Sequence, residues 1–217
     1  ILGASGSGKT VLMLFLAAMA QKWRREDLFP SNVKSKRLTT VYFDKDRAAE
    51  PGIRALGGQY FMVKSGEVSG FAPFMLEPTK RNIIFIKQLM KILCTANGNT
   101  LSERREKMLN DGINRVMKLP KELRAFGVTK LLENISEPST AEAREDGLKI
   151  RLAKWAQGGD LAWVFDNDND TFDLSEYDIF GIDGTEFLDN PDVCPAISFY
   201  LLYRFTSLLD GRRLIIQ

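Results

Sequence analysis

The first ten residues constrain the fold of this chain more than any other part of it. The pattern Gly-x-x-x-x-Gly-Lys-Thr occupies residues 3–10, and the apolar run Val11–Ala20 follows directly. Glycines let such a loop curl so that its amides face phosphate oxygens, and the helix that follows adds the positive end of its dipole. The pattern therefore predicts a phosphate-binding loop between a strand and a helix.

Two side chains of this loop carry the chemistry that we expect. The Lys9 ammonium would reach the β- and γ-phosphates of ATP, and the Thr10 hydroxyl would coordinate Mg²⁺. Lys9 and Thr10 are thus the predicted catalytic residues, and Thr10 is the predicted metal ligand. The predicted nucleotide-binding residues are Gly3, Ala4, Ser5, Gly6, Ser7, Gly8, Lys9, Thr10 and Val11.

The residues around the loop predict alternating strands and helices. Ile1 and Leu2 would end a first strand, and a helix would run from Lys9 to about Arg25. The β-branched and aromatic run 39–43 predicts a second strand, followed by a short helix over 50–56 and a third strand over 60–63. Alternation of this kind is typical of a parallel sheet with crossover helices.

The middle of the chain, from about residue 80 to 157, shows helical periodicity instead. Apolar residues recur at helical spacing over 83–93, 102–117 and 140–155, and Ser102 is a candidate helix cap. Beyond it, we predict strands over 162–165, 177–182 and 214–216 and a helix over 195–209.

These patterns predict an α/β fold with a mainly parallel sheet and an all-helical insertion. The predicted domain organisation is a core over 1–79 and 159–217, interrupted by a helical insertion over 80–158.

Carboxylates at strand ends are candidates for the rest of the site, because ligands bind outside the carboxyl ends of parallel strands. Asp44 and Asp166 each follow a predicted strand, and we expect either of them to lie near the nucleotide. Asp183 and Thr185 also follow a strand, but we interpret that segment as a turn.

Composition excludes several other classes of site. The chain has no histidine, which removes Ser-His and Cys-His catalysis and the usual zinc sites. Cys94 and Cys194 lack metal-ligand or redox spacing. The chain has 30 Lys and Arg and 28 Asp and Glu, so its net charge is +2. This near-balance does not support a strongly basic nucleic-acid surface.

Several segments outside the loop resemble one family. The segments are Tyr42–Glu50, Arg54–Tyr60, Phe165–Asp170, Tyr200–Arg204 and Leu209–Arg213. Together they resemble the large VirB/TrbE/CagE ATPases of type IV secretion and conjugation, and the resemblance runs over essentially the whole chain.

This resemblance implies a RecA-like P-loop motor domain with a helical insertion. It also implies ATP and Mg²⁺ as ligands. Asp44 and Arg47 are weaker candidates for contacts with the active site. Relatives form hexamers at the cytoplasmic face of the bacterial inner membrane. They work with other secretion components and power channel or pilus assembly and substrate transfer. The resemblance also implies a piece of a longer protein, in which membrane association comes from other regions and the Walker B acidic pair follows Gln217.

Two alternatives remain open at this point. One is a DNA-translocating motor of the FtsK/HerA or coupling-protein type, which shares the loop and would show DNA-stimulated, salt-sensitive ATPase activity. The other is a nucleotide-binding scaffold that holds partners through its helical insertion, whatever the state of Lys9.

Overall fold

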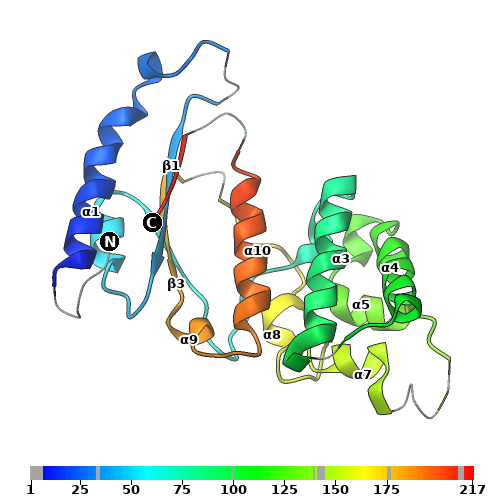
Figure 1. Ribbon diagram of the computed structural model, residues 1–217. Helices are drawn as coiled ribbons and strands as arrows, with labels where there is room; N and C mark the ends of the chain where they lie inside the picture. The colour runs from blue at the N-terminus through cyan, green and yellow to red at the C-terminus, as the bar shows by residue number, and fades with distance from the viewer. Residues whose placement is uncertain are drawn as a thin grey trace. The chain divides into compact units, whose positions relative to one another are not determined.

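The computed structural model describes residues 7–32, 35–98, 100–138, 140, 145–174, 177–209 and 213–217 (Figure 1). The chain divides into two compact units. The sheet unit comprises Ile1–Val63, Leu174–Asp189 and Leu202–Gln217, and the helical unit comprises Lys64–Asp173 and Asn190–Leu201.

A four-stranded parallel sheet forms the centre of the sheet unit. Its strands lie in the order β2-β3-β1-β4. They are β1 (Leu38–Asp44), β2 (Gln59–Met62), β3 (Ile179–Asp183) and β4 (Arg213–Ile216). Each pairing is parallel, with Thr40 opposite Ile179 and Asp44 opposite Asp183. The strands predicted over 39–43, 60–63, 177–182 and 214–216 are thereby confirmed, with bounds shifted by one or two residues.

Helices α1 (Lys9–Ala20) and α2 (Glu50–Ala55) contribute to one apolar cluster of the sheet unit. Met13 and Leu14 of α1 contact a buried set that consists of Tyr42, Ala49, Ile53, Tyr60 and Ile179. Gly52 makes the close approach possible, because a Cβ atom there would lie 2.8 Å from a methyl carbon of Leu14. After α1 the chain forms the 3-10 turns η1 (Gln21–Arg24) and η2 (Glu26–Leu28). The α-helix predicted to run to about Arg25 therefore ends at Ala20.

Short helices complete the sheet unit. Helix α9 (Thr185–Leu188) follows β3 directly. Helix α10 (Cys194–Thr206) gives its first residues to the helical unit and its last residues to the sheet unit. In the sheet unit, the ring of Phe205 on α10 contacts Phe43 edge-on, with centroids 5.4 Å apart.

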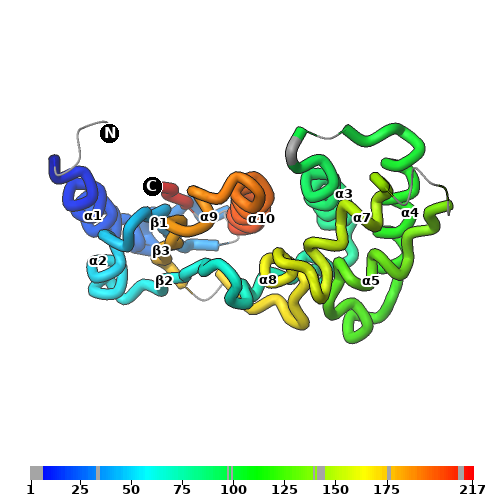
Figure 2. The backbone as a smooth tube through the Cα atoms, turned by 90° about the horizontal axis from the view of Figure 1, so that it is seen from below, coloured from blue at the N-terminus to red at the C-terminus, as the bar shows by residue number. Residues whose placement is uncertain are grey.

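Four helices gather in the helical unit (Figure 2): α3 (Lys80–Thr95), α4 (Glu103–Met117), α5 (Gly127–Asn134) and α7 (Leu148–Ala153). Thr79 and Ser102 cap α3 and α4, since each side-chain oxygen accepts a hydrogen bond from an amide three residues on. Shorter elements are η3 (Pro73–Met75), η4 (Ala96–Gly98), η5 (Lys121–Leu123) and α8 (Ala162–Phe165). The core of the helical unit includes Phe85, Ile86, Leu89, Leu109, Ile113, Val128, Leu131 and Trp155.

The strand predicted over 162–165 is wrong, because these residues form the helical turn α8. A short apolar run fits a buried strand and a buried helical turn equally well, so its pattern cannot separate them. Val164 and Phe165 are fully buried here, which explains the apolar run without a sheet. The helix predicted over 140–155 is an α-helix over Leu148–Ala153, and residues 141–144 lie outside the described part.

The helical unit is also larger than the predicted insertion over 80–158. It begins at Lys64 and includes 159–173 and 190–201. Aromatic packing explains the difference, because the ring of Phe71 contacts Phe165 and Tyr200, with centroids 6.3 and 4.7 Å apart. In the part of the chain that the structure describes, no helix has the length and apolar character needed to cross a bilayer.

Candidate functional site

The start of α1 is the centre of the candidate site. Gly8 precedes the helix with a left-handed backbone (φ 79°), and Lys9 and Thr10 are the first two helical residues. No side chain caps this end of the helix in the described residues, and its first turn has no acidic residue. A helix start of this kind, with the positive end of the helix dipole and no acidic side chain in its first turn, favours an anionic ligand.

Part of the predicted loop lies in this described segment. Ser7 and Gly8 are exposed, and Lys9 and Thr10 are half-buried. Val11 is 72% exposed. The predicted positions Gly3, Ala4, Ser5 and Gly6, and the strand expected before them, lie outside the described residues.

Figure 1 shows that α1 begins at the end of the sheet where β1 and β3 finish. Two carboxylates mark this end, because Asp44 and Asp183 are the last residues of the two strands and lie directly opposite each other. Both residues are largely buried. Two negative groups at neighbouring positions need donors or a cation close by, and the structure supplies both.

The carboxylate of Asp44 holds the segment that follows β1. Its Oδ2 atom accepts a hydrogen bond from the Ala49 amide at 2.8 Å and one from the Tyr60 hydroxyl at 2.7 Å. Burial raises the pKa of Tyr60 far above its usual value, and the hydrogen bond to Asp44 raises it further. Tyr60 therefore keeps its proton and donates a hydrogen bond to Asp44.

Gly181 on β3 creates the space for the Tyr60 ring. A Cβ atom at this position would lie 2.6 Å from Cδ2 of Tyr60, well inside van der Waals contact. The glycine of β3 and the tyrosine of β2 thus set the position of the hydroxyl that reaches Asp44.

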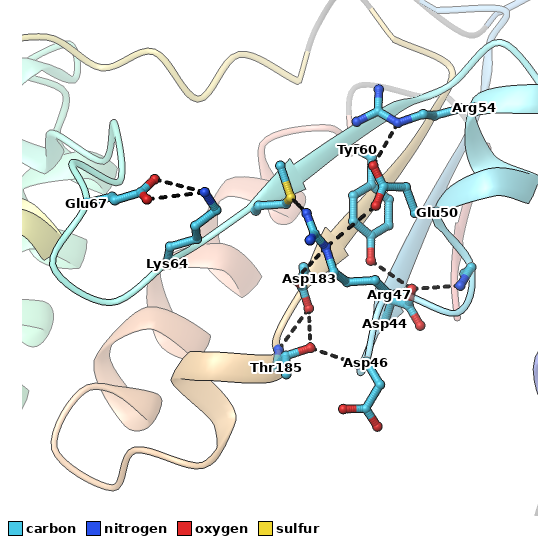
Figure 3. A network of polar contacts seen from close by, with 12 residues as sticks. Asp44, Asp46, Arg47, Glu50, Arg54, Tyr60, Lys64, Glu67, Asp183 and Thr185 are labelled. Carbon is cyan, nitrogen blue, oxygen red and sulfur yellow. Dashed lines mark hydrogen bonds and ion pairs between the residues drawn. The ribbon is translucent and has the colours of Figure 1, made fainter.

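Arg47 supplies the cation near the second carboxylate (Figure 3). Its Nε atom lies 3.5 Å from Oδ2 of Asp183 and 3.6 Å from Oε2 of Glu50. Asp46 and Arg47 both have left-handed backbones (φ 65° and 58°), an unusual conformation for residues with side chains. Strained residues of this kind persist where surrounding contacts hold them, and they are enriched at functional sites.

Thr185 connects the same turn to β3. Its amide and hydroxyl donate to Oδ1 of Asp183 at 3.0 and 2.5 Å, and its hydroxyl oxygen accepts the Asp46 amide at 2.7 Å. The turn after β1 is therefore held from both strands, which gives Arg47 a defined place at this end of the sheet.

Asp166 has a different surrounding from the one we predicted. It follows the helical turn α8 rather than a strand, and it lies buried in the helical unit. Its Oδ1 atom accepts the amides of Val128 and Thr129 at 2.9 and 3.1 Å, and its Oδ2 atom accepts the Thr129 hydroxyl at 2.5 Å. Asp166 caps α5, and the strand end that placed it beside the nucleotide does not exist.

Sequence reasoning missed Asp183, Thr185 and Tyr60 as parts of the site. A signal for Asp183 was present, because it ends an apolar strand in the same way that Asp44 does. No pattern identified Tyr60, since its contact with Asp44 depends on which strands are neighbours in the sheet.

Comparisons with known proteins give the chain its relatives. It is 42% identical over 221 residues to the type IV secretion system protein PtlC of Bordetella pertussis, with 99% of the chain and 25% of PtlC covered. It is 39% identical to the type IV secretion system protein VirB4 of Brucella suis, over 99% of the chain and 26% of that protein. The chain thus spans about a quarter of the length of these relatives, and no protein-family model matches it.

A solved structure shares the fold. It is that of VirB4 of Thermoanaerobacter pseudethanolicus, with a TM-score of 0.65 and 16% sequence identity. The match covers 99% of this chain and 58% of that one. From these sequence relationships, the chain belongs to the VirB4 and PtlC family of type IV secretion system proteins.

Proposed function

We propose that this chain is the nucleotide-binding part of an ATP-hydrolysing motor subunit of a type IV secretion system. One observation carries the proposal: the segment Gly8-Lys9-Thr10 opens α1 with a left-handed glycine, at the end of a parallel sheet where two strands finish in carboxylates. Ligands of α/β proteins bind at this end of the sheet, and phosphates bind at helix starts. A RecA-like core with a helical insertion is the fold that fits this arrangement.

Two residues would hold the nucleotide and its metal ion. The Lys9 ammonium would contact the β- and γ-phosphates and offset the charge that develops during phosphoryl transfer. The Thr10 hydroxyl would be a ligand of Mg²⁺, which neutralises charge on the phosphate oxygens when it is bound. The uncapped first turn of α1 fits an anionic ligand of this kind.

The turn after β1 would form a second wall of the site. We place Arg47 there as a cation that senses or contacts the phosphates, and Asp44 as the residue that positions the turn through Ala49 and Tyr60. Asp166 is not part of this proposal, because it caps α5 in the helical unit.

The names of the relatives support a proposal for the assembly in which the chain works. Proteins similar to it are named as type IV secretion system components. We propose that the whole protein forms a hexameric ring at the cytoplasmic face of the inner membrane. There it would work with other secretion components and power channel or pilus assembly and substrate transfer. Direct DNA binding is not part of the proposal, because the charge of the chain is nearly balanced.

Titration with a fluorescent ATP analogue in the presence of Mg²⁺ tests nucleotide binding. Lys9→Ala should weaken binding at least tenfold, because it removes the cation that contacts the phosphates. Lys22→Ala, which removes a lysine from η1, is the matched control and should bind as the parent chain does. Equal binding by the parent chain and Lys9→Ala would refute the proposal.

A further inference from the structure

Charge is distributed unevenly along this chain. None of its 30 lysines and arginines lies between Ala156 and Tyr203, whereas eleven of its 28 acidic residues do. In the helical unit, the parts of this stretch are 156–173 and 190–201, and they contain six aspartates. These two segments of the helical unit are therefore acidic, although the chain as a whole is nearly neutral.

The acidic stretch borders an apolar hollow of about 460 Å³ in the helical unit. Val68, Phe126 and Trp163 supply its apolar surface, and Gln157, Gly158 and Asp168 also line it. No lysine or arginine is among the described residues that line it. Val68 is 74% exposed and Phe126 is 36% exposed, so two large apolar side chains face solvent here.

Hydrogen bonds hold the walls of the hollow in place. Phe126 has a left-handed backbone (φ 52°), and its amide donates to the Asn167 carbonyl at 3.1 Å. Its carbonyl accepts the Lys130 amide at 2.9 Å, so the residue is fixed from both sides. Next to Val68, the Ser69 amide donates to the Trp163 carbonyl at 3.1 Å.

Hydrogen bonds also fix three other lining residues, Gln157, Asp166 and Asn167. The Asn167 side-chain amide donates to Oγ of Ser69 at 3.1 Å and to the Phe71 carbonyl at 2.9 Å. The Thr129 hydroxyl joins Asp166 to the Gln157 amide. A surface that is already ordered loses little conformational entropy when a partner binds, which favours recognition.

We propose that this hollow is a docking site for a basic protein segment that carries one or two large apolar side chains. The apolar residues of the segment would cover Val68, Phe126 and Trp163, and its lysines or arginines would lie near Asp168. Charge complementarity selects a basic partner, since an acidic segment would be repelled by the same residues. This site is separate from the proposed nucleotide site and does not depend on it.

Two labelled synthetic peptides test the proposal on the 217-residue chain. They share leucine and phenylalanine at the same positions, and the remaining positions are all lysine in one and all glutamate in the other. Fluorescence anisotropy should show binding of the lysine peptide that weakens with added salt, and much weaker binding of the glutamate peptide. Amide shifts in NMR spectra should map the lysine peptide to Val68, Phe126, Gly158 and Asp168.

Variants with matched controls separate docking from general attraction. Val68→Ser and Asp168→Lys should each weaken binding of the lysine peptide by about fivefold, the effect expected of one exposed contact. The controls are Ile84→Ser on α3 and Asp111→Lys on α4, which change an exposed apolar and an exposed acidic residue elsewhere in the helical unit. All four positions are exposed, so thermal unfolding should be unchanged.

Four outcomes would overturn the proposal. They are no binding of the lysine peptide at millimolar concentration, equal binding of the two peptides, amide shifts confined to another surface, and control variants that weaken binding as much as Val68→Ser and Asp168→Lys do.

Discussion

At the scale of single residues, the Tyr60 hydroxyl has the most clearly defined task in the candidate site. It donates to a buried carboxylate oxygen of Asp44, and its ring occupies the space that Gly181 leaves open. Asp44 in turn accepts a hydrogen bond from the amide of Ala49, the residue just before α2. The position of the turn that carries Arg47 therefore depends on a contact between two strands.

Tyr60→Phe tests this contact. The substitution keeps the ring and removes one donor from a buried carboxylate, so it should lower the free energy of unfolding by about 1–3 kcal/mol. Urea unfolding followed by circular dichroism measures the change. Tyr177→Phe, which alters a tyrosine in ring contact with Phe61, is the control and should change stability by less than about 0.5 kcal/mol. A loss no larger than that of the control would show that the hydrogen bond contributes little.

The raised pKa of Tyr60 gives a second prediction at this scale. The folded protein keeps the phenolic proton at pH values where the unfolded chain has released it. The stability from this group is therefore complete below the unfolded pKa of about 10 and is lost as pH rises above it. The difference in unfolding free energy between the parent chain and Tyr60→Phe should shrink above pH ~10. A difference that stays constant or grows through this range would contradict the assignment.

At the scale of elements, α5 depends on a carboxylate that reaches it from a distant part of the sequence. Asp166 accepts hydrogen bonds from two amides and one hydroxyl in the first turn of α5. The residue before the helix, Phe126, has no side-chain acceptor of its own, so Asp166 takes the place of a local cap.

Asp166→Ala should therefore destabilise the chain by about 2 kcal/mol and speed hydrogen exchange at the Val128 and Thr129 amides. Exchange measured by NMR gives both the size and the location of the effect. Asp168→Ala, two residues away and exposed, should leave these amides unchanged. Unchanged exchange at Val128 and Thr129 in Asp166→Ala would mean that the cap is not needed.

The elements themselves differ in how well the sequence predicts them. β1 was predictable because Thr39, Thr40 and Val41 favour strands and because the sheet buries both faces of that strand. α4 was predictable from Ser102 and an apolar face that continues for four turns. The turn α8 was not, since four apolar residues fit either structure until their tertiary neighbours are known.

At the scale of the whole molecule, the two halves of the candidate site were unequally predictable. Gly8, Lys9 and Thr10 form a local motif, so their sequence alone indicates a phosphate-binding helix start. Asp183 and Tyr60 join Asp44 only through the strand order β2-β3-β1. That order is a property of the folded sheet, and no short pattern in the sequence contains it.

The central claim is that ATP binds where α1 begins and β1 ends. The most direct measurement is a titration of the isotope-labelled chain with Mg²⁺-ATP, followed through its amide shifts. We predict the largest shifts at Ser7–Val11 and further shifts at Asp44–Arg47, and we predict that Lys9→Ala removes both. Saturating Mg²⁺-ATP that leaves Ser7–Val11 unchanged, or that shifts residues of α3 and α4 instead, would contradict the account.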